Sequence, residues 1–309
     1  MLVVAALGGN ALLRRCEPLT WEVQQVNARI AATALGGILA AGHRLIVTHG
    51  NGPQVGLLAL QAAGRDDALP FDALDAATGG TIGYLIEREL RSVRPGGDFA
   101  TVLTQVEVDP ADPAFGQPEK PVGPVYRRAE AERLAGRFGW IIAPEGEGWR
   151  RVVASPSPRR ILGLECVRLL SEAGVAVICT GGGGIPVAGD GRGGWRGIEA
   201  VIDKDRASAL LARGLSADAL LLLTDVKGVY RHFGDPGQEL LTAISATDVP
   251  DLGLAPGSMG PKAEAALEFA GDAGGLSVIG ALEDATEMLA GRAGTRVTDP
   301  GGHFRDGEG

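Results

Sequence analysis

The sequence predicts an α/β fold with a mainly parallel central sheet and helices on both of its faces. Short apolar runs typical of buried strands alternate along the chain with longer segments in which apolar residues recur every three or four positions. Strand, helix and strand in repeated order favour parallel strands joined by crossover helices. The chain has 309 residues, 45% of them hydrophobic, which is enough to bury a sizeable core in two domains or one two-lobed unit.

Each element is predicted from its own pattern. Strands are expected at 2–7, 44–48, 99–106, 175–179, 219–224 and 276–279. Helices are expected at 22–41, 54–63, 81–91, 160–173, 205–213 and 262–271. In the first helix Val23, Val26 and Ile30 follow the helical spacing, and Gly42 lies just beyond them as a C-terminal stop.

Residues 109–158 depart from this alternation. They hold a proline-rich stretch, a basic helix-like stretch "YRRAEAERLAGRFG", and two apolar runs, "WIIA" and "RRVVA", joined by "PEGEG". The two runs predict a β-hairpin. We therefore expect a small subdomain that projects from the sheet. The polar, glycine-rich end of the chain, 298–309, is expected to be frayed.

Composition argues against several classes of function. A net charge of −9 disfavours nucleic acid as a partner, because phosphate backbones are bound by basic surfaces. The longest apolar runs, such as 219–224, are far shorter than the roughly 20 residues of a membrane-spanning helix. The first residues indicate a buried strand rather than a signal peptide, so we expect a cytoplasmic protein.

The three cysteines, Cys16, Cys166 and Cys179, do not form a recognisable set. Their number is odd and they show no Cys-x-x-Cys spacing, which argues against a disulfide framework and against a zinc site. We expect them to be buried or half-buried thiols.

Four glycine clusters lie where the sheet is expected to bind ligands. They are "GGN" at 8–10, "HGNGPQVG" at 49–56, "TGGGGIPV" at 180–187 and "GSMGPK" at 257–262. Glycine lets backbone N–H groups approach a ligand closely, and a following helix N-terminus favours phosphate or carboxylate. One cluster alone is better explained as a tight turn, but four at one edge of the sheet favour an anion site. The P-loop, dinucleotide and protein-kinase fingerprints are absent from the sequence.

Lysine is rare in this chain, with four among 29 basic residues: Lys120, Lys204, Lys227 and Lys262. A compact ammonium on a flexible stem can follow a phosphoryl group as it moves. In "VIDKD" two aspartates flank Lys204, and they would orient it and keep it charged. Asp203 is alternatively a helix cap, and both interpretations can hold. Lys227 follows a strand in a turn, where a solvated side chain is expected.

Several stretches in order along the chain resemble the motifs of the carbamate kinases in the amino acid kinase family. They include "ALGGNALL", "THGNGPQVG", "EKPVGPVY", "RRVVASPSP", "IEAVIDKDRASALLA", "LLTDVKGVY" and "APGSMGPK", and together they span about residues 3–297. "EKPVGP" and the hairpin after it resemble the protruding subdomain that sets carbamate kinases apart from acetylglutamate, uridylate and aspartate kinases.

The resemblance implies an open αβα sandwich of the amino acid kinase type, assembled as a homodimer. Residues 1–214 would form an N-terminal lobe for carbamate or carbamoyl phosphate, with the subdomain at about 109–158, and 215–309 a nucleotide lobe. The implied reaction is reversible phosphoryl transfer between ATP and carbamate, giving ADP and carbamoyl phosphate, with Mg²⁺. Its expected use is ATP synthesis in arginine breakdown by the deiminase pathway, or in related nitrogen catabolism.

The resemblance also implies a role for individual residues. Those near the transferring phosphoryl group would be Gly8, Gly9, Asn10, Lys120, Lys204, Asp205 and Lys262. Those cradling carbamate would be Gly50, Asn51 and Gly52. Those holding the nucleotide would be Thr224, Asp225, Val226, Tyr230, Gly257, Ser258 and Met259. Carbamate is already an anion and needs no general base, so His49 is interpreted as a structural loop histidine.

Two departures from the family pattern stand out. Ala77, Thr78, Gly79 and Gly80 occupy the place where the family commonly has Met-Thr-Gln-Gly, so a long polar side chain is lost. If that side chain faces the acid site or the dimer contact, we expect a different affinity or assembly. Lys227 replaces an aspartate in the nucleotide-side turn. Two other functions remain open from the residues: a sister kinase for another small acid or a nucleotide, and a non-catalytic sensor of carbamoyl phosphate or nucleotide.

Overall fold

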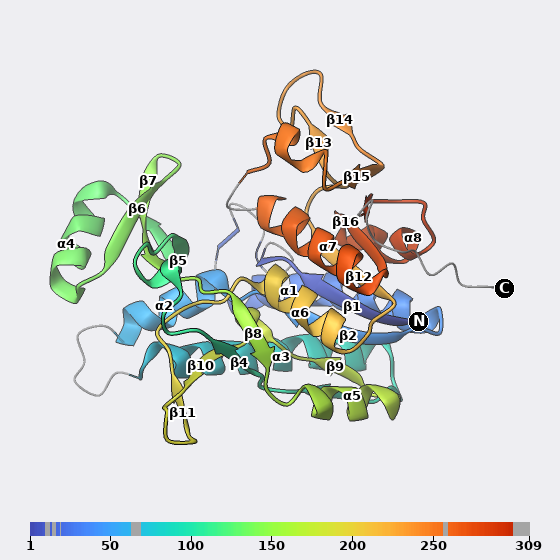
Figure 1. Cartoon of the computed structure of the whole chain (residues 1–309), viewed down its shortest axis with the longest axis horizontal. Coiled ribbons are helices and arrows are strands. Elements are labelled where there is room, and N and C mark those ends of the chain that lie inside the picture. The colour runs from blue at the N-terminus through green and yellow to red at the C-terminus, as the bar shows by residue number, and fades with distance from the viewer. Residues whose placement is uncertain (10–12, 14–16, 19, 63–68, 256–258, 299–309) are drawn as a thin grey trace.

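An eight-stranded sheet forms the centre of the computed structural model, which describes residues 1–9, 13, 17–18, 20–62, 69–255 and 259–298 (Figure 1). The strands in spatial order are β15 (Ala243–Ser245), β17 (Thr295–Thr298), β16 (Leu276–Ala281), β12 (Ala219–Thr224), β1 (Leu2–Leu7), β2 (Arg44–His49), β9 (Ala176–Ile178) and β3 (Phe99–Thr101). Neighbouring strands run parallel, except that β17 is antiparallel to β16. The predicted mainly parallel sheet is confirmed.

Helices cover both faces of this sheet. One face packs on α1 (Trp21–Ala40), α3 (Phe71–Val93) and α8 (Ala285–Leu289), and the other on α5 (Leu164–Glu172), α6 (Lys204–Gly214) and α7 (Met259–Ala273). Side chains of β1 alternate between the two cores: Val3 joins the α1 side and Val4 the α6 side. The predicted αβα sandwich is therefore the observed architecture.

Two smaller sheets lie beside the sandwich. One of them has four strands, in the spatial order β11 (Trp195–Gly197), β10 (Ile185–Gly189), β4 (Gln105–Val108) and β8 (Pro158–Ile161). The other joins β5 (Lys120–Tyr126), β7 (Gly148–Val153) and β6 (Ile141–Glu145), is accompanied by α4 (Arg128–Phe138), and projects at the left of Figure 1. Strands β6 and β7 pair antiparallel, so the predicted hairpin is confirmed. A short pair, β13 (Tyr230–Arg231) and β14 (Glu239–Leu240), lies near the top of the view.

The projecting sheet contacts the sandwich through two glycines. A Cβ atom on Gly56 of α2 (Gly52–Ala62) would lie 1.9 Å from the backbone nitrogen of Gly123 in β5. Gly123 has a φ of +77°, a conformation that side chains disfavour. The backbones of α2 and β5 thus touch directly, and this contact brings Lys120 toward the edge of the central sheet.

Three predicted elements were wrong in extent. The expected strand 99–106 is two strands in different sheets, because Thr104 donates its hydroxyl to the Val102 carbonyl and accepts from the Thr180 N–H. The expected helix 160–173 begins only at α5, since β8 and a left-handed Gly163 precede it. The expected helix 81–91 begins ten residues earlier, directly after Pro70.

Two smaller expectations also need correction. Cys166 is exposed, whereas Cys179 is buried as expected, and Cys16 lies outside the described residues. In α1, Val26 and Ile30 are 60% and 37% exposed, because the helix buries its small residues, Ala28 and Ala31 among them, against the sheet. Of the predicted frayed end, residues 299–309 lie outside the described chain. Within the described ranges, no helix is long and apolar enough to cross a membrane.

Candidate active site

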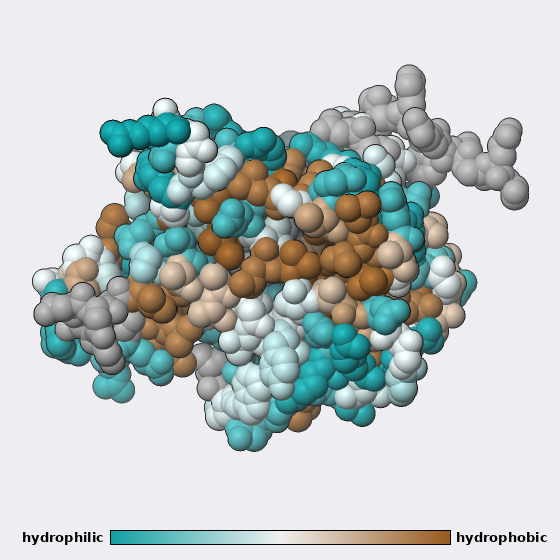
Figure 2. All heavy atoms as spheres, turned by 90° about the horizontal axis from the view of Figure 1, so that it is seen from below, coloured by the Kyte–Doolittle hydropathy of each residue, from teal (hydrophilic) through white to brown (hydrophobic). Residues whose placement is uncertain are grey.

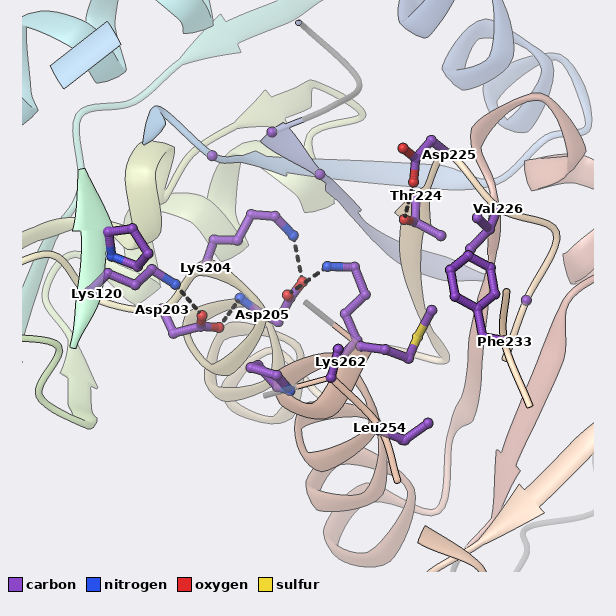
Figure 3. Close-up of a pocket in the computed structure, with 18 of the residues that line it drawn as sticks. Lys120, Asp203, Lys204, Asp205, Thr224, Asp225, Val226, Phe233, Leu254 and Lys262 are labelled. Carbon is purple, nitrogen blue, oxygen red and sulfur yellow. Dashed lines mark hydrogen bonds and ion pairs between the residues drawn. The ribbon is translucent and has the colours of Figure 1, made fainter. Parts of the chain in front are cut away.

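A cavity of about 620 Å³ opens at the carboxyl ends of β1, β2 and β12 (Figure 3). Its walls come from the ends of these strands, the first turns of α6 and α7, and β5 of the projecting sheet. The predicted residues that line it are Gly8, Gly9, Gly50, Asn51, Lys120, Lys204, Asp205, Thr224, Asp225, Val226, Tyr230, Met259 and Lys262. Gly52 is the first residue of α2. Asn10, Gly257 and Ser258 lie outside the described residues.

One carboxylate joins two lysines at the centre of the cavity. Lys204 Nζ donates to Asp205 Oδ1 at 2.5 Å, and Lys262 Nζ donates to Oδ2 at 3.1 Å. Figure 3 shows the two ammonium groups on opposite sides of the carboxylate, that of Lys204 from α6, which also carries Asp205, and that of Lys262 from α7. Asp205 and Lys262 are both buried. The carboxylate therefore fixes both ammonium positions before any ligand arrives.

Burial and charge act against each other in this trio. Burial opposes ionisation of Asp205, but Lys204 and Lys262 outweigh it and lower the pKa of the carboxyl. Burial, reinforced by Lys262 and opposed by Asp205, lowers the pKa of the Lys204 ammonium. An incoming anion would relieve the repulsion between the two ammonium groups, so the trio is suited to hold a phosphoryl group.

Asp203 serves two structural purposes. Its Oδ1 accepts from the backbone N–H groups of Asp205 and Arg206, at 2.9 and 3.3 Å, and so caps α6. Its Oδ2 accepts from Lys120 Nζ at 2.6 Å, an ion pair across 83 positions of sequence. The cap predicted from the sequence is confirmed, and the same carboxylate holds the lysine of the projecting sheet at the cavity.

Glycines let the backbone approach the side chain of Lys204 closely. A Cβ on Gly50 would lie 3.4 Å from the Lys204 stem and 3.6 Å from the Gly9 nitrogen. A Cβ on Gly8 would lie 3.0 Å from the Leu223 carbonyl oxygen. The ends of β1, β2 and β12 therefore converge on the lysine, and their backbone donors lie at the same edge of the sheet.

His49 is buried immediately before this wall. Burial lowers the pKa of His49 to about 4. The contact of Nδ1 with the Gly50 carbonyl acts in the opposite direction, and the charge of Lys204 adds to the lowering. The ring is neutral at physiological pH. This agrees with the interpretation of His49 as a structural histidine rather than a base.

The end of the cavity opposite Lys120 is apolar. Val226, Phe233 and Leu254 lie there, on the far side of the lysine cluster in Figure 3. Phe233 and Leu254 are not among the residues predicted from the sequence. Phe233 lies in the connection between β13 and β14, and Leu254 lies in the segment after η4 (Val249–Leu252). The one feature of the sequence that could have indicated them is that they are large apolar residues in loops. Phe233 is 65% exposed. Such a surface suits the flat face of a nucleobase.

The sequence model of the amino acid kinase family matches residues 1–279. The chain belongs to this family. It is 50% identical to carbamate kinase from Haemophilus influenzae over 301 residues, covering 96% of this chain and 97% of that protein. It is 42% identical to carbamate kinase from Pyrococcus horikoshii over 310 residues, covering 96% and 98%.

A solved structure leads to the same family. Carbamate kinase from Giardia lamblia bound to AMP-PNP superposes with a TM-score of 0.87 at 38% identity, covering 96% of this chain and 98% of that one. Isopentenyl phosphate kinase from T. acidophilum, at 15% identity and a TM-score of 0.57, shares the fold alone. This amino acid kinase is therefore an enzyme of the phosphotransferase class and groups with the carbamate kinases.

The two departures from the family motif have distinct surroundings. Gly79 of α3 faces Gly181: a Cβ atom added to Gly79 would lie 3.6 Å from the carbonyl oxygen of Gly181. The next residue, Gly182, lines the cavity. Gly80 faces the side chain of Leu103, which is 57% exposed. Lys227 is exposed, as expected, and is not among the residues that line the cavity.

Proposed function

We propose that this amino acid kinase transfers a phosphoryl group reversibly between ATP and carbamate. The arrangement of Lys204, Asp205 and Lys262 at a glycine-walled cavity carries the proposal, together with carbamate kinase relatives along nearly the whole chain. A carbamate oxygen forms a bond to the γ-phosphorus while the bond from that phosphorus to the ADP oxygen breaks. ADP leaves with the electron pair, and carbamoyl phosphate results.

The main obstacle to this reaction is repulsion between two anions. No proton has to be removed from carbamate, so the protein contributes position and positive charge. Lys204 and Lys262 would neutralise the moving phosphoryl group, and Lys120 would approach it from the projecting sheet. Backbone N–H groups of Gly9 and Asn10 would donate to the same oxygens. The Gly8 N–H, which was predicted to do so, instead donates to the Leu223 carbonyl at 3.1 Å.

The two substrates would occupy opposite ends of the cavity. We propose that residues 1–214, including the subdomain at about 109–158, hold carbamate through Gly50, Asn51 and Gly52. Residues 215–309 would hold the nucleotide, through Thr224, Asp225, Val226, Tyr230, Gly257, Ser258 and Met259. The apolar end formed by Phe233 and Leu254 supports this orientation, because a nucleobase fits an apolar slot and carbamate does not.

Magnesium would enter with the nucleotide. Among the described residues no cluster of three or more His, Cys, Asp or Glu side chains is placed to hold a metal ion. Of the cavity carboxylates, Asp203 and Asp205 are paired with ammonium groups, and Asp225 lies at the nucleotide end. This set fits Mg²⁺ held mainly by phosphate oxygens and water, its usual mode in kinases. The ion would reduce the charge on the phosphates.

The decisive experiment mixes purified protein with Mg-ADP and carbamoyl phosphate and measures ATP. We expect ATP from the wild type and a fall in kcat of about 100-fold or more in Lys204→Ala and Lys262→Ala. Lys227→Ala, which removes an exposed lysine from the same edge, is the matched control and should keep the wild-type kcat. Full activity in either cavity variant would remove that lysine from the mechanism.

The same assay decides between the alternatives. A sensor of carbamoyl phosphate or nucleotide would bind ligand without turnover. A sister kinase would be active with another small acid or a nucleotide and inactive with carbamate. The relatives at 42–50% identity favour carbamate over other acids. We further propose that the enzyme works in the cytoplasm, in the direction of ATP synthesis during arginine or related nitrogen breakdown.

We also propose that two copies assemble through an apolar face. Figure 2 shows apolar residues gathered across the side that lies at the bottom of Figure 1. Tyr84 on α3 and Leu103 after β3 are 54% and 57% exposed. Large apolar patches on a protein surface mark interfaces. Light scattering should give twice the chain mass of 31.8 kDa, and Tyr84→Glu with Leu103→Glu should halve it. A monomeric wild type would contradict the proposal.

A further inference from the structure

The side chain of Asn51 is held from behind by helix α3. Its Nδ2 donates to Asp75 Oδ1 at 2.6 Å and to Thr78 Oγ1 at 3.1 Å. A side-chain amide has two N–H protons, so both are used. Asn51, Asp75 and Thr78 are exposed by 2%, 1% and 3%. Water therefore does not compete for these bonds.

The opposite side of the Asn51 amide rests on a glycine. A Cβ on Gly182 would lie 2.4 Å from Nδ2 and 2.9 Å from Oδ1 of Asn51. The amide is thus clamped between α3 and the turn η3 (Gly181–Gly183) and has no room to rotate away from Asp75. Since Asn51 lies between Gly50 and Gly52, the clamp also sets the peptide planes whose N–H groups would meet the acid substrate.

We propose that Asp75 is a positioning residue for the carbamate half of the site, acting through the amide of Asn51. This rests on the proposed function, which places carbamate at Gly50, Asn51 and Gly52. Asp75 is not itself among the residues that line the large cavity. Its effect should therefore fall on the binding of carbamate or carbamoyl phosphate and not on the nucleotide, which is bound at the other end.

The surroundings of Asp75 argue against a purely structural role. Among the described residues its Oδ2 has no hydrogen-bond partner, and it faces a small cavity of about 10 Å³ lined also by His49 and Gly79. Burial, opposed by the bond from Asn51 and assisted by Asp72, raises the pKa of Asp75 to about 7. A buried carboxyl with one unsatisfied oxygen destabilises a fold, so an apolar residue here would be the better choice for stability alone. The bond to Asn51 is what the carboxyl supplies.

Steady-state kinetics with Mg-ADP and carbamoyl phosphate test the proposal. We expect Asp75→Ala to raise the KM for carbamoyl phosphate about tenfold and to leave the KM for ADP within about twofold, because one strong bond to the amide is lost. Asp75→Asn should stay near wild type in both constants, since its carbonyl oxygen still accepts from Asn51. Circular dichroism and thermal melting confirm that each variant is folded.

A second pair of variants covers the case in which Asp75→Ala does not fold. Thr78→Val removes the other acceptor and should raise the same KM, whereas Thr78→Ser keeps the hydroxyl and should not. Thr33→Val is the control for loss of a helix hydroxyl, because the Thr33 hydroxyl donates to the Arg29 carbonyl at 2.9 Å, away from the site.

Two outcomes would overturn the inference. One is an unchanged KM for carbamoyl phosphate in the folded Asp75→Ala and Thr78→Val proteins. The other is an equal rise in both KM values. A wild type that makes no ATP would instead refute the proposed function, so the two failures are distinguishable.

Discussion

Lys120 and Asp203 form an ion pair of 2.6 Å between the projecting sheet and the N-cap of α6. Burial opposes ionisation of Asp203, but Lys120 and Lys204 outweigh it and lower the pKa of the carboxyl. The same carboxylate caps the helix that carries Lys204 and Asp205. The place of Lys120 and the start of α6 are therefore set by one side chain.

The two contacts of Asp203 can be separated by substitution. Asparagine is a good N-cap, so Asp203→Asn should keep the stability of the fold while losing the ionic bond to Lys120, and kcat should fall roughly tenfold. Asp203→Ala should show the same kinetic loss and, in addition, about 1 kcal/mol less unfolding free energy in urea. Equal stability of the two variants would contradict a capping role.

Removal of Asp205 should be more damaging than removal of either lysine. Asp205→Asn leaves two buried ammonium groups without their carboxylate, and breaking such a buried pair costs about 3 kcal/mol or more. We expect lower unfolding free energy and no measurable turnover. The double variant Asp205→Asn with Lys262→Met should recover part of the stability without recovering activity, as urea denaturation and the ATP assay would show.

Asp75 and His49 should give opposite pH dependences of stability. The pKa of Asp75 is raised from 3.8 to about 7, so between these values the folded state holds a proton that the unfolded state lacks, and stability falls as pH rises. The pKa of His49 is lowered from 6.5 to about 4, so there the unfolded state holds the extra proton and stability rises with pH. Over the shared window the two slopes oppose each other.

Single substitutions should expose each slope. The unfolding free energy of Asp75→Asn minus that of wild type should increase from pH 4 to 7, by up to about 1.4 kcal/mol per pH unit, and then level off. The unfolding free energy of His49→Gln minus that of wild type should change in the opposite direction. This difference should be greatest near pH 4 and should decrease until about pH 6.5. Urea titrations at unit pH steps measure both differences, and a flat difference for either variant would show that the group is not buried as described.

The contact between Gly56 and Gly123 should tolerate no side chain. Gly56→Ala would place a Cβ within 2.0 Å of the Gly123 backbone, so β5 must shift and Lys120 with it. We expect kcat to fall by about tenfold or more, with faster hydrogen exchange in β5 and an unchanged central sheet. Gly136→Ala is the control: it lies within α4 with nothing within 4 Å of its Cβ, and should stabilise that helix by up to about 1 kcal/mol.

The sequence predicts well where local pattern and burial coincide. Strands 2–7 and 219–224 were predicted to the residue, because each is an unbroken apolar run buried on both faces. The break after β3 could not be predicted, because it depends on a bond between Thr104 and Thr180, which are far apart in the chain. The first ten residues of α3 were missed, because only Phe71 and Leu74 are large apolar residues there, and a polar or small residue occupies each of the other buried positions of that segment.

Candidate site residues divide in the same way. The lysines could be predicted as site residues because lysine is rare in this chain, and the glycines because they cluster after predicted strands. The aspartates could be predicted because they flank Lys204. Phe233 and Leu254 reach the cavity only through the folding of loops, and no spacing relates them to Lys204. Asp75 is a single acid within a helix, and its contact with Asn51 becomes visible only when α3 lies against the end of β2.

The cluster of lysines and aspartates in the cavity carries a net positive charge. Three ammonium groups, of Lys120, Lys204 and Lys262, stand there against two carboxylates, of Asp203 and Asp205. A surplus of one positive charge is thus held inside a chain whose net charge is −9. Small inorganic anions such as sulfate should therefore compete with the substrates, and more strongly than the acidity of the whole molecule would suggest.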